Sequence, residues 1–335
     1  WITLCVLFVL PFVDVRRPLR MLHLDLLMLA GFSVSLAYFN DANLGASVPL
    51  SFVPLVYLGV RLAVIGLRRT PRPPAPLRLL IPWRALAMLT LFLVGLRVGL
   101  NMTDGNVIDV GYSGVIGADR LTHGKQLYGN WPKDDERGDT YGPAAYAAYV
   151  PFEQLWPWHG TWDDLESAHA AAIFFDLLCT LLLFLIGRQI RGPTLGIMLA
   201  YAWVSFPFSL YALNTNSNDT LVGTAVVATL LFAARAPIRG ALGALAGMVK
   251  FAPLALAPVL ATYDPSGRTS WKRVGLFAAG FAAMMALLLW PVLAHTTLHE
   301  MYERTVAYQA DRGAPFSIWG LYGWSGAEKI AQGRR

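Results

Sequence analysis

The residues best suited to chemistry lie in one acidic segment, residues 101–149. A carboxylate within hydrogen-bond reach of a substrate hydroxyl can remove its proton, so this segment offers candidates for a general base. It has four basic residues and seven of the chain's 21 acidic residues, namely Asp104, Asp109, Asp119, Asp134, Asp135, Glu136 and Asp139. The rest of the chain is mostly apolar, and its elements determine which of these carboxylates meets a substrate.

Composition indicates a membrane protein. The 335-residue chain is 56% hydrophobic and 14% charged, whereas soluble domains carry about 25% charged residues. Its repeated apolar runs are about 17 to 22 residues long, which is enough for a helix to cross a bilayer core. They lack the alternation of barrel strands. The sequence therefore predicts an all-α, polytopic transmembrane helical protein with about 8–10 membrane segments.

Basic loops between the apolar runs indicate the topology. The expected membrane segments are residues 1–13, 22–38, 48–67, 79–100, 168–186, 193–213, 221–234 and 274–293. Loops rich in Lys and Arg, including the basic proline-rich stretch 68–74, are expected on the cytoplasmic side. Residues 101–149 and 295–317 then lie outside, carrying short interfacial helices near the aromatic stretch 142–162.

Residues 241–263 break this alternation because basic residues flank both ends. One span cannot place both ends on the cytoplasmic side. Its middle carries Lys250, followed by Pro253 and Pro258. We therefore expect a broken, re-entrant pair of short helices that meet near Lys250, a feature tolerated where it lines a protein-buried or watery cavity.

Charge, cysteines and chain ends add three expectations. The formal net charge of +6 is explained by the cytoplasmic loops, so no nucleic acid is expected as a partner. Cys5 and Cys179 fall in apolar runs, and no disulfide is expected. The chain begins at Trp1 inside an apolar run and stops at a polar Gly333-Arg334-Arg335, which is compatible with sequence missing at either end.

The order of several short motifs resembles a known group of enzymes. Asp109 follows a span by a few residues, Gly124 to Tyr128 matches a Gly-x-x-x-Tyr element, and Tyr141-Gly142-Pro143 precedes an aromatic stretch. Lys250-Phe251-Ala252-Pro253 then occupies the re-entrant position. This pattern, over roughly residues 96–322, resembles polytopic GT-C glycosyltransferases, in particular glycosyltransferase family 87. Tyr141-Gly142-Pro143-Ala144 departs from the family's Tyr-x-Pro-Pro element by lacking its second proline.

The resemblance implies an activity and an organisation. Such enzymes, which include actinobacterial mannosyltransferases, transfer a sugar from a polyprenyl-phosphate donor outside the membrane. We therefore expect a multi-pass plasma-membrane hexosyltransferase that moves a mannose-type sugar to a lipid or cell-envelope glycan acceptor, with an extracytoplasmic active site and membrane lipids as partners. Residues 79–335 would form the GT-C-like catalytic core, which is compatible with sequence missing at its C-terminal end. Residues 1–78 would be extra N-terminal membrane segments.

The resemblance also implies a catalytic base. In GT-C enzymes an acidic residue in the first outer loop has this role, and Asp109 best matches its position. Asp119 and Asp139 are acidic alternatives, while the cluster at residues 134–136 is interpreted as solvated surface. Asp176, Tyr128 and Tyr141 are candidates for the intramembrane cavity. A structural ion pair of Asp176 with Arg97 or Lys250 is the simpler alternative.

A departing polyprenyl phosphate needs cationic partners outside the membrane. The candidates are Lys250, Arg304, Arg312 and His299, although nearby Glu303 and Asp311 could neutralise the two arginines. His295 and His299 have the i, i+4 spacing of a metal pair but lack the accompanying Glu of zinc proteases. No glycine-rich nucleotide loop is present. We expect no cofactor and no metal site, with a divalent metal left as an open alternative.

Two other function classes are compatible with these features. A broken helix with a mid-membrane Lys also occurs in the substrate pathways of transporters and lipid flippases. An inactive scaffold subunit is a third possibility. The carboxylate just past a span and two sizeable outside segments favour surface chemistry, and hence an enzyme.

Overall fold

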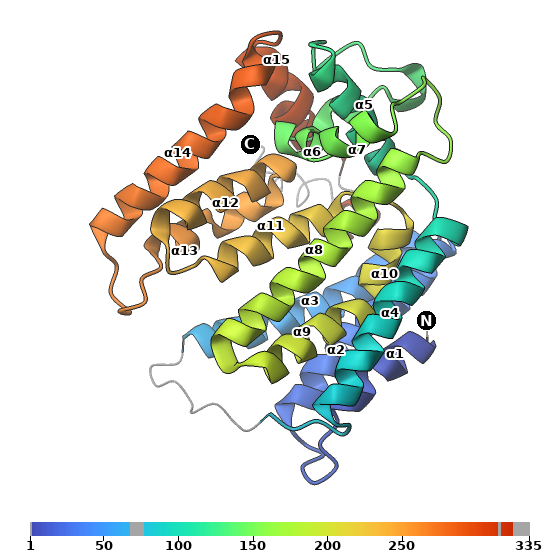
Figure 1. The fold of residues 1–335 in the computed structure, drawn as a ribbon, viewed down its shortest axis with the longest axis vertical. Coiled ribbons are helices and arrows are strands. Elements are labelled where there is room, and N and C mark those ends of the chain that lie inside the picture. Colours follow the sequence, from blue (N-terminus) through green and yellow to red (C-terminus); the bar gives the residue numbers. More distant parts are fainter. Residues whose placement is uncertain (1, 68–76, 314–315, 324–335) are drawn as a thin grey trace. The chain divides into compact units, whose positions relative to one another are not determined.

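The computed structural model describes residues 2–67, 77–313 and 316–323, and all regular structure in these ranges is helical (Figure 1). The residues pack into two compact units, Trp1–Leu93 with Tyr201–Leu210 and Ala310–Arg335, and Val94–Ala200 with Tyr211–Gln309. The proline-rich loop 68–74 and the polar end 333–335 of the sequence interpretation lie outside the described residues. The predicted division at residue 78 stays a prediction.

In the first unit, α2 (Met21–Asn40) and α3 (Leu44–Gly66) pack as a helical hairpin, and α1 (Ile2–Val9) packs against α2. Asn43 caps α3 by accepting a hydrogen bond from Ala46 N at 3.1 Å. Asp25 of α2 accepts hydrogen bonds from Tyr57 Oη at 2.7 Å and Arg61 Nε at 2.9 Å, both on α3. Pairing satisfies charges that would be costly to leave exposed to lipid.

Among the described residues, five helices are long and apolar enough to cross a membrane: α2, α3, α4 (Trp83–Asp104), α8 (Glu166–Arg191) and α14 (Trp271–Leu293). The run 193–213, expected as one span, instead forms α9 (Pro193–Ser205) and α10 (Pro207–Asn214), which meet at 59°. Pro207 explains the break, because a proline inside a helix removes a backbone hydrogen bond and clashes with the preceding turn.

The run 221–234 is also shorter than a full span. It forms α11 (Asp219–Leu231), whose 13 residues extend about 20 Å along the axis, against about 30 Å for a hydrocarbon core. The next helix, α12 (Ala236–Val249), is similarly short at 14 residues. Both helices lie in the second unit, where α12 packs against α11 and α14 (Figure 1).

The predicted break near Lys250 is confirmed. Helix α12 ends at Val249, and Lys250 is extended, with φ −141° and ψ 146°. A 3-10 turn (Ala252–Leu256) and α13 (Ala257–Thr262) then return along α12. Arg239 Nη2 donates to Tyr263 O at 3.0 Å, so the beginning of α12 and the end of α13 lie together, as a re-entrant pair requires.

Close backbone approach joins α12 to α14. A Cβ atom at Gly240 would lie 2.0 Å from Phe277 O, a distance no side chain tolerates. Membrane helices without a large apolar driving force associate through such small residues, because their backbones can pack closely.

The acidic segment is a folded element with its own core. It contains α5 (Asp109–Thr122) and α6 (Pro143–Ala147) and is followed directly by α7 (Val150–Leu155), and the three helices gather at one end of α8 (Figure 1). Ile116, Tyr146 and Tyr149 are fully buried there and share one apolar cluster with Phe175 of α8 and Met248 of α12. This confirms the predicted short helices and fixes the segment rigidly to the membrane helices.

Candidate active site

Asp109 begins helix α5 and its side chain is exposed. Its Oδ1 accepts a hydrogen bond from Val110 N at 2.9 Å, and its backbone carbonyl accepts one from Ser113 Oγ at 2.7 Å. Free N–H groups and the helix dipole favour negative charge at a helix N-terminus. The position therefore suits a carboxylate and leaves its side chain open to solvent.

Backbone hydrogen bonds hold the approach to Asp109 against the polar turn that follows α10. Asn106 N donates to Asn214 O at 2.8 Å, and Ile108 N donates to Thr215 O at 3.2 Å. Gly111 packs so closely that a Cβ atom there would lie 2.3 Å from Asn216 O. These contacts determine where Asp109 sits relative to the turn.

The same polar turn holds Lys250. Asp219 ends the turn and begins α11, and its Oδ1 forms an ion pair with Lys250 Nζ. Lys250 Nζ also lies 5.5 Å from the centroid of the Tyr141 ring, a cation–π distance. The Lys250 side chain is 27% exposed. The structure thus brings Lys250 and Tyr141 of the predicted set together, and adds Asp219, which the sequence interpretation gave no role.

A buried amide network supports the turn from the end of α4. Asn101 is fully buried and its Nδ2 donates to Leu213 O and to Asn216 Oδ1, both at 2.8 Å. His169 Nδ1 lies 2.9 Å from Asn101 Oδ1. Asn101 was read only as the start of the polar segment. Its sequence signal is an amide side chain at the end of an apolar run. Such a polar group needs hydrogen-bond partners once it is buried.

The interpretation of residues 134–136 as solvated surface is wrong for Asp135. Its carboxylate is half-buried and accepts a hydrogen bond from Ser113 Oγ at 2.8 Å, while Asp134 accepts one from Tyr112 Oη at 3.1 Å. Burial, reinforced by Asp109 and other carboxylates, raises the pKa of Asp135 to about 7. The run of three acidic residues cannot reveal this burial, because the partner Ser113 lies on another helix, α5.

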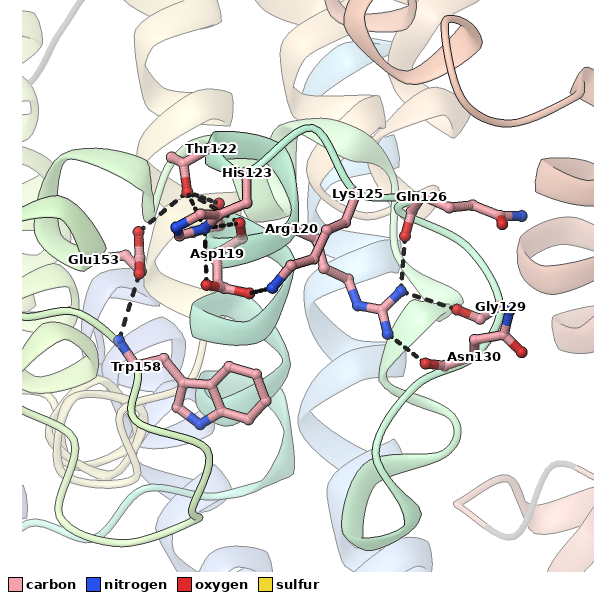
Figure 2. A network of polar contacts seen from close by, with 11 residues as sticks. Asp119, Arg120, Thr122, His123, Lys125, Gln126, Gly129, Asn130, Glu153 and Trp158 are labelled. Carbon is pink, nitrogen blue, oxygen red and sulfur yellow. Dashed lines mark hydrogen bonds and ion pairs between the residues drawn. The ribbon is translucent and has the colours of Figure 1, made fainter.

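Asp119 is paired with side chains of its own loop. Its Oδ2 lies 2.9 Å from Lys125 Nζ and its Oδ1 lies 3.0 Å from His123 Nδ1, as Figure 2 shows. Both carboxylate oxygens of Asp119 are thus engaged by side chains of its own loop.

Arg120 shapes the loop after α5. Its guanidinium points into the curve of the loop and donates to the carbonyls of Gln126 at 2.7 Å, Gly129 at 3.0 Å and Asn130 (Figure 2). One side chain therefore satisfies three carbonyls that the irregular backbone leaves without partners.

Asp139, the other acidic alternative, is fully buried. Its Oδ2 accepts from Gly129 N at 2.7 Å and lies 3.5 Å from Arg304 Nε. Burial raises the pKa of Asp139. Arg304 lies on a π-helical stretch, Glu303–Ala307, and its side chain is 34% exposed. Tyr128 is buried nearby and donates to Tyr141 O at 3.0 Å. Asp139 thus positions Arg304 and cannot easily meet a substrate.

His299, Arg312 and Asp176 complete the predicted set. His299 is exposed on α15 (Leu298–Tyr302), and Arg312 belongs to the other compact unit. Asp176 forms a buried ion pair with Arg97, with Arg97 Nη2 2.6 Å from Asp176 Oδ1, which confirms the simpler alternative for this carboxylate. Within the described residues, no three His, Cys, Asp or Glu side chains converge as a metal site.

Comparison with known proteins identifies the family. The model of glycosyltransferase family 87 matches residues 140–327, more than half of the chain. The chain belongs to glycosyltransferase family 87. It is therefore a transferase enzyme that acts on a sugar donor and an acceptor, and its spanning helices indicate an integral membrane protein. No match was found among curated proteins or among solved structures. The family match includes Lys250 and Arg304 and begins after Asp109.

Proposed function

We propose that this family 87 enzyme transfers a mannose-type sugar from a polyprenyl-phosphate donor to a lipid or cell-envelope glycan acceptor on the extracytoplasmic face of the plasma membrane. The observation that supports this most strongly is that one polar turn holds both Asp109 and Lys250. Asp109 is tied to it through the backbone at Asn106 and Ile108, and Lys250 through Asp219.

The proposed reaction uses these two groups on opposite sides of the sugar. Asp109 accepts the proton of the acceptor hydroxyl as its oxygen bonds to the anomeric carbon. The bond from that carbon to the phosphate oxygen breaks, and its electron pair leaves with the polyprenyl phosphate. Lys250 stabilises the charge gathered on the phosphate.

Arg304 is the second candidate for the donor phosphate. It is partly exposed, and its guanidinium is held by Asp139. Burial raises the pKa of Asp139, and the charge of Arg304 opposes this shift. Arg312 and His299 stay as candidates for the same role. Tyr128 and Tyr141 support this side of the site.

The test replaces the proposed base without changing its size. Asp109→Asn is reconstituted in liposomes with labelled polyprenyl-phosphate mannose and a lipid acceptor. Transfer should fall by about 10²–10⁴-fold, because the general base is lost. Asp104→Asn is the matched control, since Asp104 is also exposed and lies five residues earlier. Its activity should stay near wild type. Undiminished transfer by Asp109→Asn contradicts the role of Asp109.

A further inference from the structure

A second charged cluster lies at the other end of α14 from the acidic segment. Helix α14 leads to Glu300, which accepts a hydrogen bond from Gln126 of that segment at 2.6 Å. At its beginning lie Lys272 and Arg273, close to Arg235 and Arg239 of the turn and helix before them. The 23 residues of α14 extend about 35 Å. Lys250 directly follows the far end of α12, whose 14 residues extend about 21 Å, so this cluster is too far from Lys250 to share a ligand's phosphate.

The cluster carries an excess of positive charge. Arg273 Nε lies 3.2 Å from Asp264 Oδ2, and its Nη1 donates to Ala234 O at 3.0 Å. Arg235 stacks 5.7 Å from the centroid of the Phe232 ring. Within the described residues, Asp264 pairs with Arg273 and lies near Arg239, so this carboxylate offsets only part of the charge of the four cations. Such an excess attracts an anion.

Arg239 adds a buried positive charge to this cluster, and such a charge is costly to leave without a compensating partner. It is fully buried, and its guanidinium donates to the carbonyls of Ala233 and Tyr263. Its Nε is buried without a hydrogen-bond partner among the described residues. A buried charge is strongly destabilising unless opposite charge or hydrogen bonds offset it. Arg239 does not line the neighbouring cavity, so an anion bound there would compensate its charge through space and not by direct contact.

A cavity of about 520 Å³ opens at the same place. Its lining includes Arg235, Lys272 and Arg273, together with the apolar Ile238 and Leu276. Helices α12 and α14 both begin here, so free backbone N–H groups add partial positive charge. The volume is that of a small-molecule site. Cationic and apolar lining together suit an amphiphile with an anionic head.

Exposed apolar side chains show which kind of anion fits. Trp271 is 80% exposed and Leu276 is 43% exposed, in a helix that can span a membrane. Tryptophan favours the headgroup level of a bilayer, and leucine favours the acyl chains. A lipid phosphate would reach the pocket at this depth, and its chains would cover the apolar residues.

We propose that this pocket binds the phosphate headgroup of an anionic phospholipid, in the leaflet where the basic loops gather. Arg235, Lys272 and Arg273 contact the phosphate, while Ile238 and Leu276 contact the beginning of the acyl chains. The lipid thereby stabilises the re-entrant pair α12–α13 against α14. This site is separate from the one that performs sugar transfer.

The test measures thermal unfolding of the full chain in nanodiscs of phosphatidylcholine, with and without phosphatidylglycerol. Wild type should melt a few degrees higher with phosphatidylglycerol, because a ligand of the folded state stabilises it. Arg235→Gln/Lys272→Gln should lose this increase. Arg16→Gln/Arg17→Gln removes equal charge from an exposed turn and should keep it. Native mass spectrometry should show about tenfold weaker phosphatidylglycerol binding to Arg235→Gln/Lys272→Gln alone.

Other results would overturn the proposal. An equal loss in both double variants indicates general charge attraction, and no response of wild type indicates no site. Equal stabilisation of the detergent-solubilised protein by inorganic phosphate indicates a soluble anion in place of a lipid. Arg235→Lys/Lys272→Arg keeps the charges and must keep the response. If Arg235→Gln/Lys272→Gln fails to fold, loss of lipid adducts in the single variant Lys272→Gln decides.

Discussion

The Lys250 side chain is partly exposed and has an anionic partner, Asp219. Both properties matter for its proposed contact with the donor phosphate. Asp219 neutralises the ammonium before a donor arrives, which lowers the cost of a cation among apolar segments. A donor phosphate would replace or share that contact. The residue is therefore stabilised in both the free and the bound enzyme.

We expect Lys250→Gln to lower kcat/KM for a polyprenyl-phosphate donor by about 10–100-fold, or about 1.4–2.7 kcal/mol, because a charge-assisted contact to the leaving phosphate is lost. Transfer kinetics in liposomes measure this. Lys125→Gln is the matched control, since Lys125 pairs with Asp119 in the same way. Equal losses in both variants would show that the effect comes from breaking any surface ion pair.

Asp135 should make stability depend on pH. Its folded pKa of about 7 lies above the unfolded value of 3.8. Protonation therefore favours the folded state, and this contribution is full below about pH 4 and lost as the pH rises to about 7. Asp135→Asn should reduce the fall in Tm over this window by on the order of 2–4 °C. Asp134→Asn, one residue away, should reduce the fall less, because the charge of Asp134 adds to the shift of Asp135 but burial is its main cause.

At the scale of the elements, the sequence predicted the features that depend on charge and apolar length. The break at Lys250 followed from basic residues at both ends of 241–263 and from Pro253. The bend at Pro207 was missed, although a proline inside an apolar run is a sequence signal for such a break. The run 221–234 was expected to span the membrane, but it forms the short helix α11. Apolar length alone does not reveal where a helix is packed against others.

The candidate site was partly predictable for a related reason. Asp109 and Lys250 follow from their places beside spans and from the family resemblance. Asp219 and Asn101 act through contacts with residues 31 and about 115 positions away, which a single sequence does not display. Asp135 looked like surface because its partner Ser113 lies on α5.

The α12–α14 contact gives a prediction at this scale. Gly240→Ala should destabilise the protein by about 1–3 kcal/mol, because the new methyl group collides with Phe277 O and the helices must separate. Gly275→Ala, in α14, meets no atom within 4 Å and should be neutral or stabilise by up to about 1 kcal/mol. Unfolding by detergent titration measures both. A similar effect of the two substitutions would contradict close packing at Gly240.

At the scale of the whole molecule, the re-entrant pair determines the topology. Because α12 and α13 return to the side they started from, the loop at Ser266 should lie on the same side as Arg188, at the end of α8. The acidic segment should lie on the other side. Asp109, Lys250 and Arg304 all belong to the second unit.

Labelling of single cysteines tests this topology. In a chain carrying Cys5→Ser and Cys179→Ala, Glu136→Cys should react with a membrane-impermeant maleimide on intact cells. Arg188→Cys and Ser266→Cys should react only after permeabilisation. All three positions are exposed. Labelling of Ser266→Cys from outside would mean that α12–α13 crosses the membrane.

The link between Asn106, Ile108 and the polar turn has a consequence for how this family can diverge. Its hydrogen bonds run from backbone N–H to backbone carbonyl, so any residue except proline preserves them. Gly111 has no such freedom, because a side chain there meets Asn216 O. Relatives should therefore vary at positions 106 and 108 and keep glycine at position 111. The loop before the proposed base can then change its sequence and keep its backbone geometry.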